Sequence, residues 1–401
     1  MSELLEELLA KPVGPTVPTR QTDPEKDFTR QIEVKGDAAD VTVRAETFEQ
    51  TETAATDVLK GQGLDPAEWT VTGFRSSEWT MANGDTGVST RFSFARAQCA
   101  TVADERPPID ELLAAIDSTS IVPMGTGPRV AGSPHTYIVA LGDMQFGKID
   151  GDGVEGTLQR VIDCLDEAAE LLSLYRYRFA IRHVHIAWLG DHIEGFVSQG
   201  GANTWRTQLT LNEQIRLTRR VMLHALLLFA PLCERLTMAA VPGNHGEAVR
   251  INGKGVTRYD DSHDTESLIA VKDAAELNPD RFGHVEFYVP DTDELIVVVE
   301  CSGTVVGHAH GHQWRPGKHF EWWKGQAFNQ ASPMHLVDLL LAGHLHHEFV
   351  DSDGWRSFLQ PPAMESESTW WRHSKGTTGA PGLIVAITKD GRVPVKEVVS
   401  Q

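Results

Sequence analysis

Four short motifs carry carboxylate, amide and imidazole side chains, and each follows an apolar run in the last two-thirds of the chain. These are side-chain types that bind divalent metal ions. In chain order the motifs occupy residues 142–145, 190–194, 243–247 and 343–346, with the sequences GDMQ, GDHIE, GNHGE and GHLH. Each motif opens with a glycine, which permits a tight turn close to bound ions. The set predicts a metal site assembled from several loops.

A metal site of this composition is suited to phosphoester hydrolysis. Two divalent ions about 3.5–4 Å apart neutralise the negative oxygens of the ester and bring the pKa of a bound water toward neutrality. Such a pair needs ligands from several directions and one bridging carboxylate, which no single helix can supply. Taken alone, each motif also fits a turn after a strand or the start of a helix. The prediction therefore depends on the motifs occurring together and in order.

The elements that must position these motifs alternate between strands and helices. Apolar runs predict strands at 136–141, 184–189 and 237–241, and helices at 155–175 and 209–232 separate them. This alternation predicts an α/β domain whose ligands collect at strand ends. Further strands are predicted at 285–289, 295–300, 303–306, 336–342 and 383–388.

The first 120 residues differ in pattern from the rest of the chain. Residues 1–30 include a stretch rich in Pro, Thr and charged residues, which predicts a flexible arm. Residues 31–120 are predicted to form a small α+β module, and residues 121–401 a catalytic domain. The module's predicted strands are 31–34, 41–45, 69–74 and 90–95, and its predicted helices are 52–60 and 109–116.

With this order of motifs, residues 136–388 resemble the calcineurin-like metallophosphoesterase superfamily, and most of all its DNA-repair-exonuclease branch in phages and bacteria. The resemblance implies an α/β fold with two packed mixed β-sheets flanked by helices. It also implies a set of metal ligands, in which Asp191 bridges two ions. Asp143 and His346 are implied to bind the first ion, and Asn244 and His344 the second.

The resemblance implies two further roles. One histidine from residues 308–312 is implied to complete the ligand set; the family pattern favours His310, with His308 as the alternative. His245 is implied to lie over the phosphate, where it would stabilise negative charge or protonate the leaving oxygen. Asp191 and His245 are therefore the expected catalytic residues.

Gln145 departs from the family pattern, which has a histidine at this position. Its amide offers only a neutral oxygen or a non-basic nitrogen, whereas imidazole is the better ligand for borderline metals. Either Gln145 binds the first metal weakly, or it holds a water and leaves the first site loose. We expect Mn²⁺ in this centre, with Zn²⁺, Fe²⁺ and Mg²⁺ as alternatives.

The substrate is predicted from residues beside the motifs. Residues 313–328 interleave basic and aromatic side chains, which could stack bases and hold phosphates. Alternatively, these aromatic side chains pack a helix at 321–328 onto the core. Nucleic acid is the expected substrate; a small-molecule phosphatase or nucleotide pyrophosphatase, and a catalytically weak metal-binding protein, stay as alternatives. The candidate substrate-binding residues are Lys148, Trp314, Arg315 and Lys318.

Charge and composition limit these expectations. The formal net charge is -20, so the protein is not expected to coat nucleic acid by bulk electrostatics. The acidic first ten residues do not resemble a signal peptide, and no apolar run is long enough to cross a bilayer. The four scattered cysteines match no zinc spacing. We expect a cytoplasmic protein with reduced thiols, in which the N-terminal module supports a homodimer or binds a partner.

Overall fold

The computed structural model describes residues 30–35, 38–45, 57–60, 65–66, 69–80, 86–96, 106–119, 130–197, 207–251, 254–255, 257–366 and 379–400. The chain divides into two compact units, Met1–Asp104 and Glu105–Gln401. Each unit has its own β-structure and its own hydrophobic core.

The first unit contains a four-stranded antiparallel sheet in the order β1-β2-β4-β3. Its small core includes Val41, Leu59, Phe92 and Phe94. The predicted helix at 52–60 is helical over its described end, residues 57–60, so the α+β prediction is confirmed. The predicted arm, residues 1–30, lies outside the described residues except for Arg30. The strands are β1 (Arg30–Lys35), β2 (Ala38–Ala45), β3 (Trp69–Thr80) and β4 (Thr86–Arg96).

The second unit is built around two mixed sheets. The first sheet has six strands in the order β10-β7-β6-β5-β16-β17. Four of them form a parallel block, namely β5 (His135–Leu141), β6 (Ile181–Trp188), β7 (Arg235–Ala240) and β10 (Val285–Tyr288). The antiparallel pair β16 (Leu383–Lys389) and β17 (Arg392–Val399) extends this block beside β5.

The second sheet has five strands in the order β11-β12-β13-β15-β14. Its three central strands are parallel, and each edge strand pairs antiparallel with its neighbour. The central strands are β12 (Thr304–His308), β13 (Leu339–Leu341) and β15 (Arg356–Gln360), and the edge strands are β11 (Val297–Cys301) and β14 (Phe349–Asp353).

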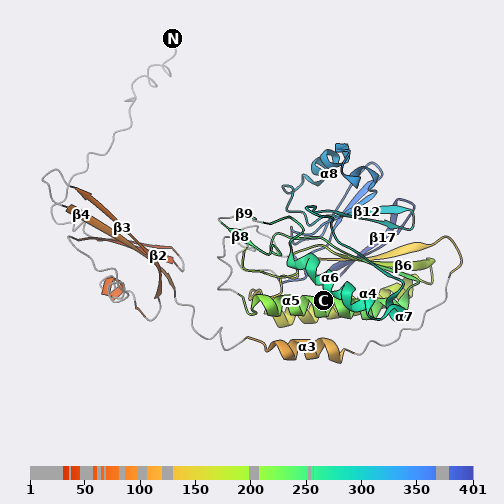
Figure 1. The fold of residues 1–401 in the computed structure, drawn as a ribbon, viewed down its shortest axis with the longest axis horizontal. Helices are drawn as coiled ribbons and strands as arrows, with labels where there is room; N and C mark the ends of the chain where they lie inside the picture. Colours follow the sequence, from red (N-terminus) through yellow and green to blue (C-terminus); the bar gives the residue numbers. More distant parts are fainter. Residues whose placement is uncertain are drawn as a thin grey trace, which may run out of the picture. The chain divides into compact units, whose positions relative to one another are not determined.

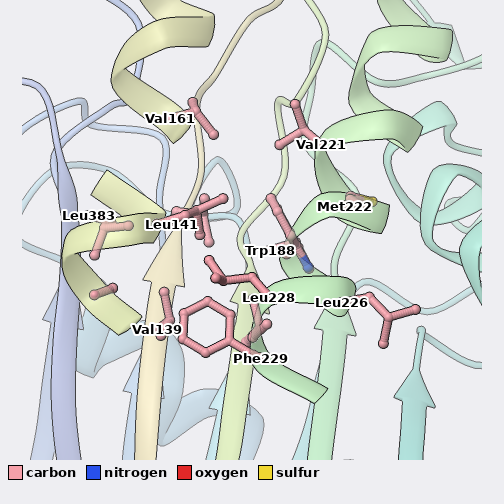
Figure 2. Packing of buried hydrophobic residues seen from close by; sticks show 14 of the residues in the cluster. Val139, Leu141, Val161, Trp188, Val221, Met222, Leu226, Leu228, Phe229 and Leu383 are labelled. Atoms are coloured by element: carbon pink, nitrogen blue, oxygen red, sulfur yellow. The ribbon is translucent and has the colours of Figure 1, made fainter. Parts of the chain in front are cut away.

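The two sheets pack face to face, and helices cover both outer faces (Figure 1). Ile138 and Ala187 of the first sheet share one buried cluster with Val306 and Leu341 of the second. The outer face of the first sheet packs against α4 (Gly153–Tyr175), α5 (Leu211–Phe229) and α6 (His263–Glu276). Part of that cluster is visible in Figure 2, with Trp188 beside residues of α5. Helix α8 (His319–Phe328) packs on the second sheet. This architecture confirms the predicted fold class.

Local sequence explains how α5 is placed. Thr210 and Glu213 form a capping box, in which each side chain accepts a hydrogen bond from the other residue's backbone N–H. From there, Leu217, Val221 and Ala225 recur at intervals of four residues and are buried, as expected for the inward stripe of an amphipathic helix. The predicted helix at 209–232 therefore corresponds to α5 together with the 3₁₀ turn η4 (Ala230–Leu232).

The boundary between the units lies earlier than predicted. We placed it at residue 120, but helix α3 (Ile109–Ser118) belongs to the second unit. Leu112, Leu113 and Ile116 are buried in the core of that unit, because they form the apolar face of α3. The correction moves the boundary to Asp104 and Glu105.

Several elements were not predicted, and they include one long helix. They are β8 (Arg250–Ile251), β9 (Lys254–Gly255), α7 (Pro279–Phe282) and the 3₁₀ turn η5 (Pro333–Leu336), together with α6, β14, β15 and β17. Cys164, Cys233 and Cys301 are free thiols, as expected, and Cys99 lies outside the described residues. Among the described helices, none has the length and apolar character needed to cross a membrane.

Candidate metal centre

The predicted ligands converge at one edge of the two facing sheets. Parallel strands bring their carboxyl ends to the same edge of a sheet, where α/β proteins usually place ligand sites. The residues come from loops that follow five different strands, two of them in the second sheet. Asp143 follows β5, Asp191 follows β6, Asn244 follows β7, His310 follows β12, and His344 and His346 follow β13.

One group of side chains surrounds Asp143, which is fully buried. Its Oδ1 lies 3.3 Å from Nε2 of His346, and Nε2 of Gln145 lies 3.4 Å from the same nitrogen. Oδ2 of Asp143 accepts a hydrogen bond of 2.8 Å from the backbone N–H of His344. Asp143, Gln145 and His346 therefore form the grouping expected around the first metal.

A second group surrounds Asp191. Its Oδ2 lies 2.9 Å from Nε2 of His310, and the ligand atoms of Asp191, His310 and His344 all lie within 4.8 Å of one another. The two groups are adjacent, because Nε2 of His310 is also 4.0 Å from Oδ1 of Asp143. His310 thus links the group around Asp191 to the group around Asp143.

Several buried polar atoms of the predicted ligands lack partners or contact only one another. Among the described residues, Oδ1 of Asn244 is buried and makes no hydrogen bond, and Oδ1 of Asp143 and Nε2 of His310 have no partner other than the ion-pair contacts given above. Leaving such atoms unsatisfied is costly unless an ion or a water satisfies them. Carboxylate, amide and imidazole donors suit Mn²⁺, Zn²⁺ or Fe²⁺, so the residues present fit divalent ions.

Backbone strain is concentrated in the same loops. Eight non-glycine residues in the described part of the chain have a positive φ, and five of them are candidate ligands. Strained conformations of this kind persist where surrounding structure enforces them, and they cluster at functional sites. The five are Asp143, Gln145, Asp191, His344 and His346, with φ of 51°, 41°, 51°, 75° and 57°.

Electrostatics make this buried region attractive to cations. Burial lowers the pKa of His310, but Asp191 and Asp143 outweigh it and raise that pKa to about 9. Burial also opposes protonation of His346, yet Asp143 and Glu365 raise its pKa to about 10. Burial alone would raise the pKa of Asp191; His310 and His245 instead hold it well below its ordinary value. The carboxylates thus stay charged and attract protons or metal ions.

His245 lies beside Asp191 with its ring held on one side. Its backbone N–H donates to Oδ1 of Asp191 at 2.7 Å, and its Nδ1 lies 2.9 Å from the carbonyl oxygen of Glu194. Burial lowers its pKa, but Asp191 and the nearby carboxylate of Glu194 outweigh burial and raise it to about 9. An oriented, protonated imidazole can donate a proton or stabilise negative charge.

Asp264, at the start of α6, joins the loops that carry Asp191 and Asn244, and sequence analysis missed it. Its fully buried carboxylate accepts backbone hydrogen bonds from Asp191, His192 and Gly243 at 3.0, 2.9 and 2.9 Å. Gly246 also leaves room for it, since a Cβ there would fall within hard contact of Oδ2. An aspartate in the first turn of a helix is ordinary, so no sequence signal marked it.

Glu365 is a second partner that the sequence did not reveal. Its Oε1 lies 3.0 Å from Nδ1 of His346 and its Oε2 lies 2.9 Å from Nζ of Lys148. His347 and Glu348, which follow the last motif directly, are exposed, and Nδ1 of His347 lies 2.7 Å from the carbonyl oxygen of Leu345. Glu365 fixes the ring of His346 and engages Lys148, a candidate substrate-binding residue.

His308 and His310, the two candidates for the same ligand position, lie in different surroundings. His310 lies between Asp191 and Asp143, as described above. His308 instead faces the interior between the sheets, with Nε2 2.7 Å from Nε2 of His185 and Nδ1 3.1 Å from the carbonyl oxygen of Val297. Since that carbonyl can only accept, Nδ1 of His308 donates to it, and Nε2 of neutral His308 accepts from His185.

His185 continues a polar chain through the interior. Its Nδ1 lies 2.7 Å from Oγ1 of Thr237, which lies 2.8 Å from Nε2 of His183. Nδ1 of His183 then lies 2.9 Å from Oγ1 of Thr136. Burial lowers the pKa of His183 to about 3 and that of His308 to about 4. These imidazoles are therefore neutral, and they hold β5, β6 and β7 of the first sheet against β12.

The aromatic and basic segment at 313–328 belongs to the outer core of the second sheet. Trp314 is 8% exposed and Trp323 is 1% exposed, and both pack in a cluster with Phe358. The packing alternative is thus confirmed for them, and Trp314 has little surface with which to stack a base. Arg315 is exposed, and Nζ of exposed Lys318 pairs with Glu321 at 2.7 Å.

Comparisons with known proteins find only distant structural similarity. No protein-family model matches the sequence, and no curated protein matches it. Vps29 from Cryptosporidium parvum is 14% identical with a TM-score of 0.28, over 67% of this chain and 99% of that chain. A novel archaeal phosphodiesterase is 12% identical with a TM-score of 0.30, over 65% and 99% of the two chains.

A predicted phosphoesterase from Streptococcus pneumoniae is similarly distant, at 12% identity and a TM-score of 0.28 over 67% of this chain and 98% of that chain. Similarity at this level carries no argument about activity. The class of the protein follows from its own architecture. It is an α/β protein with two packed mixed sheets, and a cluster of carboxylate, amide and imidazole groups lies at the carboxyl ends of their parallel strands.

Proposed function

We propose that this protein is a phosphoester hydrolase that uses two divalent metal ions. The observation that carries the proposal is the adjacency of two groups of candidate ligands, one around Asp143 and one around Asp191, with Nε2 of His310 2.9 Å from Asp191 and 4.0 Å from Asp143. The order of the motifs along the chain, which resembles that of calcineurin-like metallophosphoesterases, supports it. The proposed ligands are Asp143, Gln145 and His346 for one ion, Asn244, His310 and His344 for the other, and Asp191 for both.

The residues divide the chemistry between them. Bound ions would neutralise the phosphoester oxygens and activate a water. Asp191 holds the two ligand groups together, and its own loop is fixed by Asp264. The His245 ring, oriented by Glu194, donates a proton to the leaving oxygen or stabilises its charge. Glu365 keeps the His346 ring turned toward Asp143.

The test combines metal content with turnover. Purified protein is assayed on bis-p-nitrophenyl phosphate with added Mn²⁺, and bound metal is measured by elemental analysis. Asp191→Ala is expected to abolish metal binding and activity, whereas His245→Ala keeps the metal and loses activity. The reverse pattern would overturn these roles. A protein that binds metal but hydrolyses no phosphoester would instead be the catalytically weak binding protein considered above.

For the substrate, the described surroundings favour a small phosphoester over nucleic acid. Lys148 and Lys318 are ion-paired with Glu365 and Glu321, Trp314 is largely buried, and the chain has a net charge of -20. Nucleic acid, the first expectation, is tested with labelled single- and double-stranded DNA. Cleavage of DNA at enzyme levels comparable to those that hydrolyse small esters would restore it.

A further inference from the structure

A pocket of about 450 Å³ opens beside the candidate metal centre. Its volume lies within the range of about 300–1,000 Å³ that is usual for small-ligand sites. Gly243, which precedes Asn244, lines the pocket, as does His312. The His312 ring centroid is 5.4 Å from that of His310 and 6.2 Å from that of His344. The pocket therefore adjoins the second ligand group.

The remaining wall has an apolar part and a charged part. Pro242, Val249, Tyr259 and Leu295 contribute the apolar part, and Tyr259 is 64% exposed while Val249 is 41% exposed. An exposed tyrosine ring can stack against a planar group. Nδ1 of His312 is buried and has no hydrogen-bond partner among the described residues, so it can bond a polar atom of a ligand.

The charges near this wall do not suit a polyanion. Arg258 is held by the carboxylate of Asp260 through hydrogen bonds of 3.1 and 3.0 Å. Arg250 is held by Glu247 at 2.7 and 2.6 Å. Glu247, Asp261 and Arg258 themselves line the pocket. A second phosphate placed there would meet carboxylates and arginines that are already neutralised.

We propose that this pocket takes one ester group of the substrate, and that this group is compact, uncharged and at least partly aromatic. The substrate is then a small phosphoester with a single phosphate, rather than a nucleic acid strand. This inference rests on the proposed function, because it assumes that the phosphate lies at the adjoining metal centre.

The test measures binding by calorimetry with the Mn²⁺-loaded protein, so that it does not depend on turnover. The probes are inorganic phosphate, thymidine 5′-monophosphate and thymidine 3′,5′-bisphosphate. The monophosphate is expected to bind at least about tenfold more tightly than inorganic phosphate. The second phosphate of the bisphosphate is expected to remove most of that gain in affinity. Equal affinity for phosphate and the monophosphate would overturn the proposal, as would affinity that rises with the second phosphate.

Two variants test whether the monophosphate binds at this wall of the pocket. Leu295→Trp fills the pocket and Tyr259→Ala removes the ring; each is expected to weaken the monophosphate about tenfold while leaving inorganic phosphate within twofold. Leu174→Trp, at a position 63% exposed on α4, is the matched control. Unchanged monophosphate binding in both pocket variants contradicts the proposal. A protein that binds the probes as expected but hydrolyses no ester refutes only the proposed function.

Discussion

At the scale of single residues, two buried carboxylates outside the motifs, those of Asp264 and Glu365, hold the candidate ligands in place. Asp143, Asp191 and His346 stand in local motifs, so their residue types and order reveal a candidate site. Asp264 contacts Asp191 from 73 residues away in sequence, and Glu365 contacts His346 from 19 residues away. Contacts over such separations depend on how strands and helices pack, which local pattern does not specify.

Gln145 provides a prediction at this scale. Its side chain lies 3.4 Å from Nε2 of His346, beside Asp143. Gln145→His places an imidazole there and is expected to strengthen Mn²⁺ and Zn²⁺ binding by about tenfold or more, because imidazole is the better ligand for these ions. Competition with a fluorescent chelator measures the affinity. Unchanged affinity for both metals would show that residue 145 does not reach the ion.

Asp264 provides a second prediction. Asp264→Asn puts an amide NH₂ among three backbone N–H donors, so at least one of those donors loses its acceptor. The loops of Asp191 and Gly243 then lose their fixed positions, and metal affinity is expected to fall about 10- to 100-fold. Asp273→Asn, at an exposed position on the same helix, is the control. Metal affinity that is the same in both variants would contradict the positioning role of Asp264.

At the scale of elements, the strands that precede the motifs were predicted closely, because buried strands appear in a sequence as short apolar runs. β5, β6 and β7 begin one to three residues earlier than predicted. Their neighbours in the sheet were not predictable, since β16 pairs with β5 across more than two hundred residues. Helix α6 was missed because its buried side chains include Asp264, Thr265 and Ser267, which weaken the apolar period.

The buried histidines between the sheets, His183, His185 and His308, predict how the free energy of unfolding depends on pH. In the folded state the pKa is about 3 for His183 and about 4 for His308, below the ordinary value near 6.5. The unfolded chain therefore binds more protons below pH 6.5, and stability is lost as the pH falls from there. Each histidine contributes a slope of up to about 1.4 kcal/mol per pH unit.

Urea unfolding at pH 7, 6 and 5, with a chelator present, measures this slope. His183→Gln is expected to flatten it by about the contribution of one histidine, because an amide can bridge Thr136 and Thr237 without titrating. His347→Gln, at an exposed position, should leave the slope unchanged. Equal slopes for wild type and His183→Gln would show that His183 does not titrate on unfolding.

At the scale of the whole molecule, the division into two units places α3 with the second unit. Which unit a short helix joins depends on its tertiary partners, which the local sequence pattern does not specify. Asp117 of α3 lies 3.2 Å from Arg220 of α5, and Leu112, Leu113 and Ile116 are buried in the shared core.

Two truncations test this division. A chain of residues 105–401 is expected to retain the metal affinity and unfolding free energy of the second unit. A chain of residues 121–401 lacks α3. Burial of each of the three apolar side chains of α3 contributes about 1.5–3 kcal/mol to the free energy of unfolding. Chemical denaturation is expected to show that the shorter chain is less stable by several kcal/mol. Equal stability of the two chains would show that α3 does not contribute to the core of the second unit.

The origin of the ligands has a mechanical consequence. Asp143, Asp191 and Asn244 lie on loops that follow strands of one sheet, whereas His310, His344 and His346 lie on loops that follow strands of the other. Ions held by both sets would cross-link the two sheets at this edge. Without the ions, the interface between the sheets depends there on apolar contacts and the buried imidazoles, so the sheets should separate first at this edge under force. The rate at which bound ions exchange would then report how often the sheets separate there.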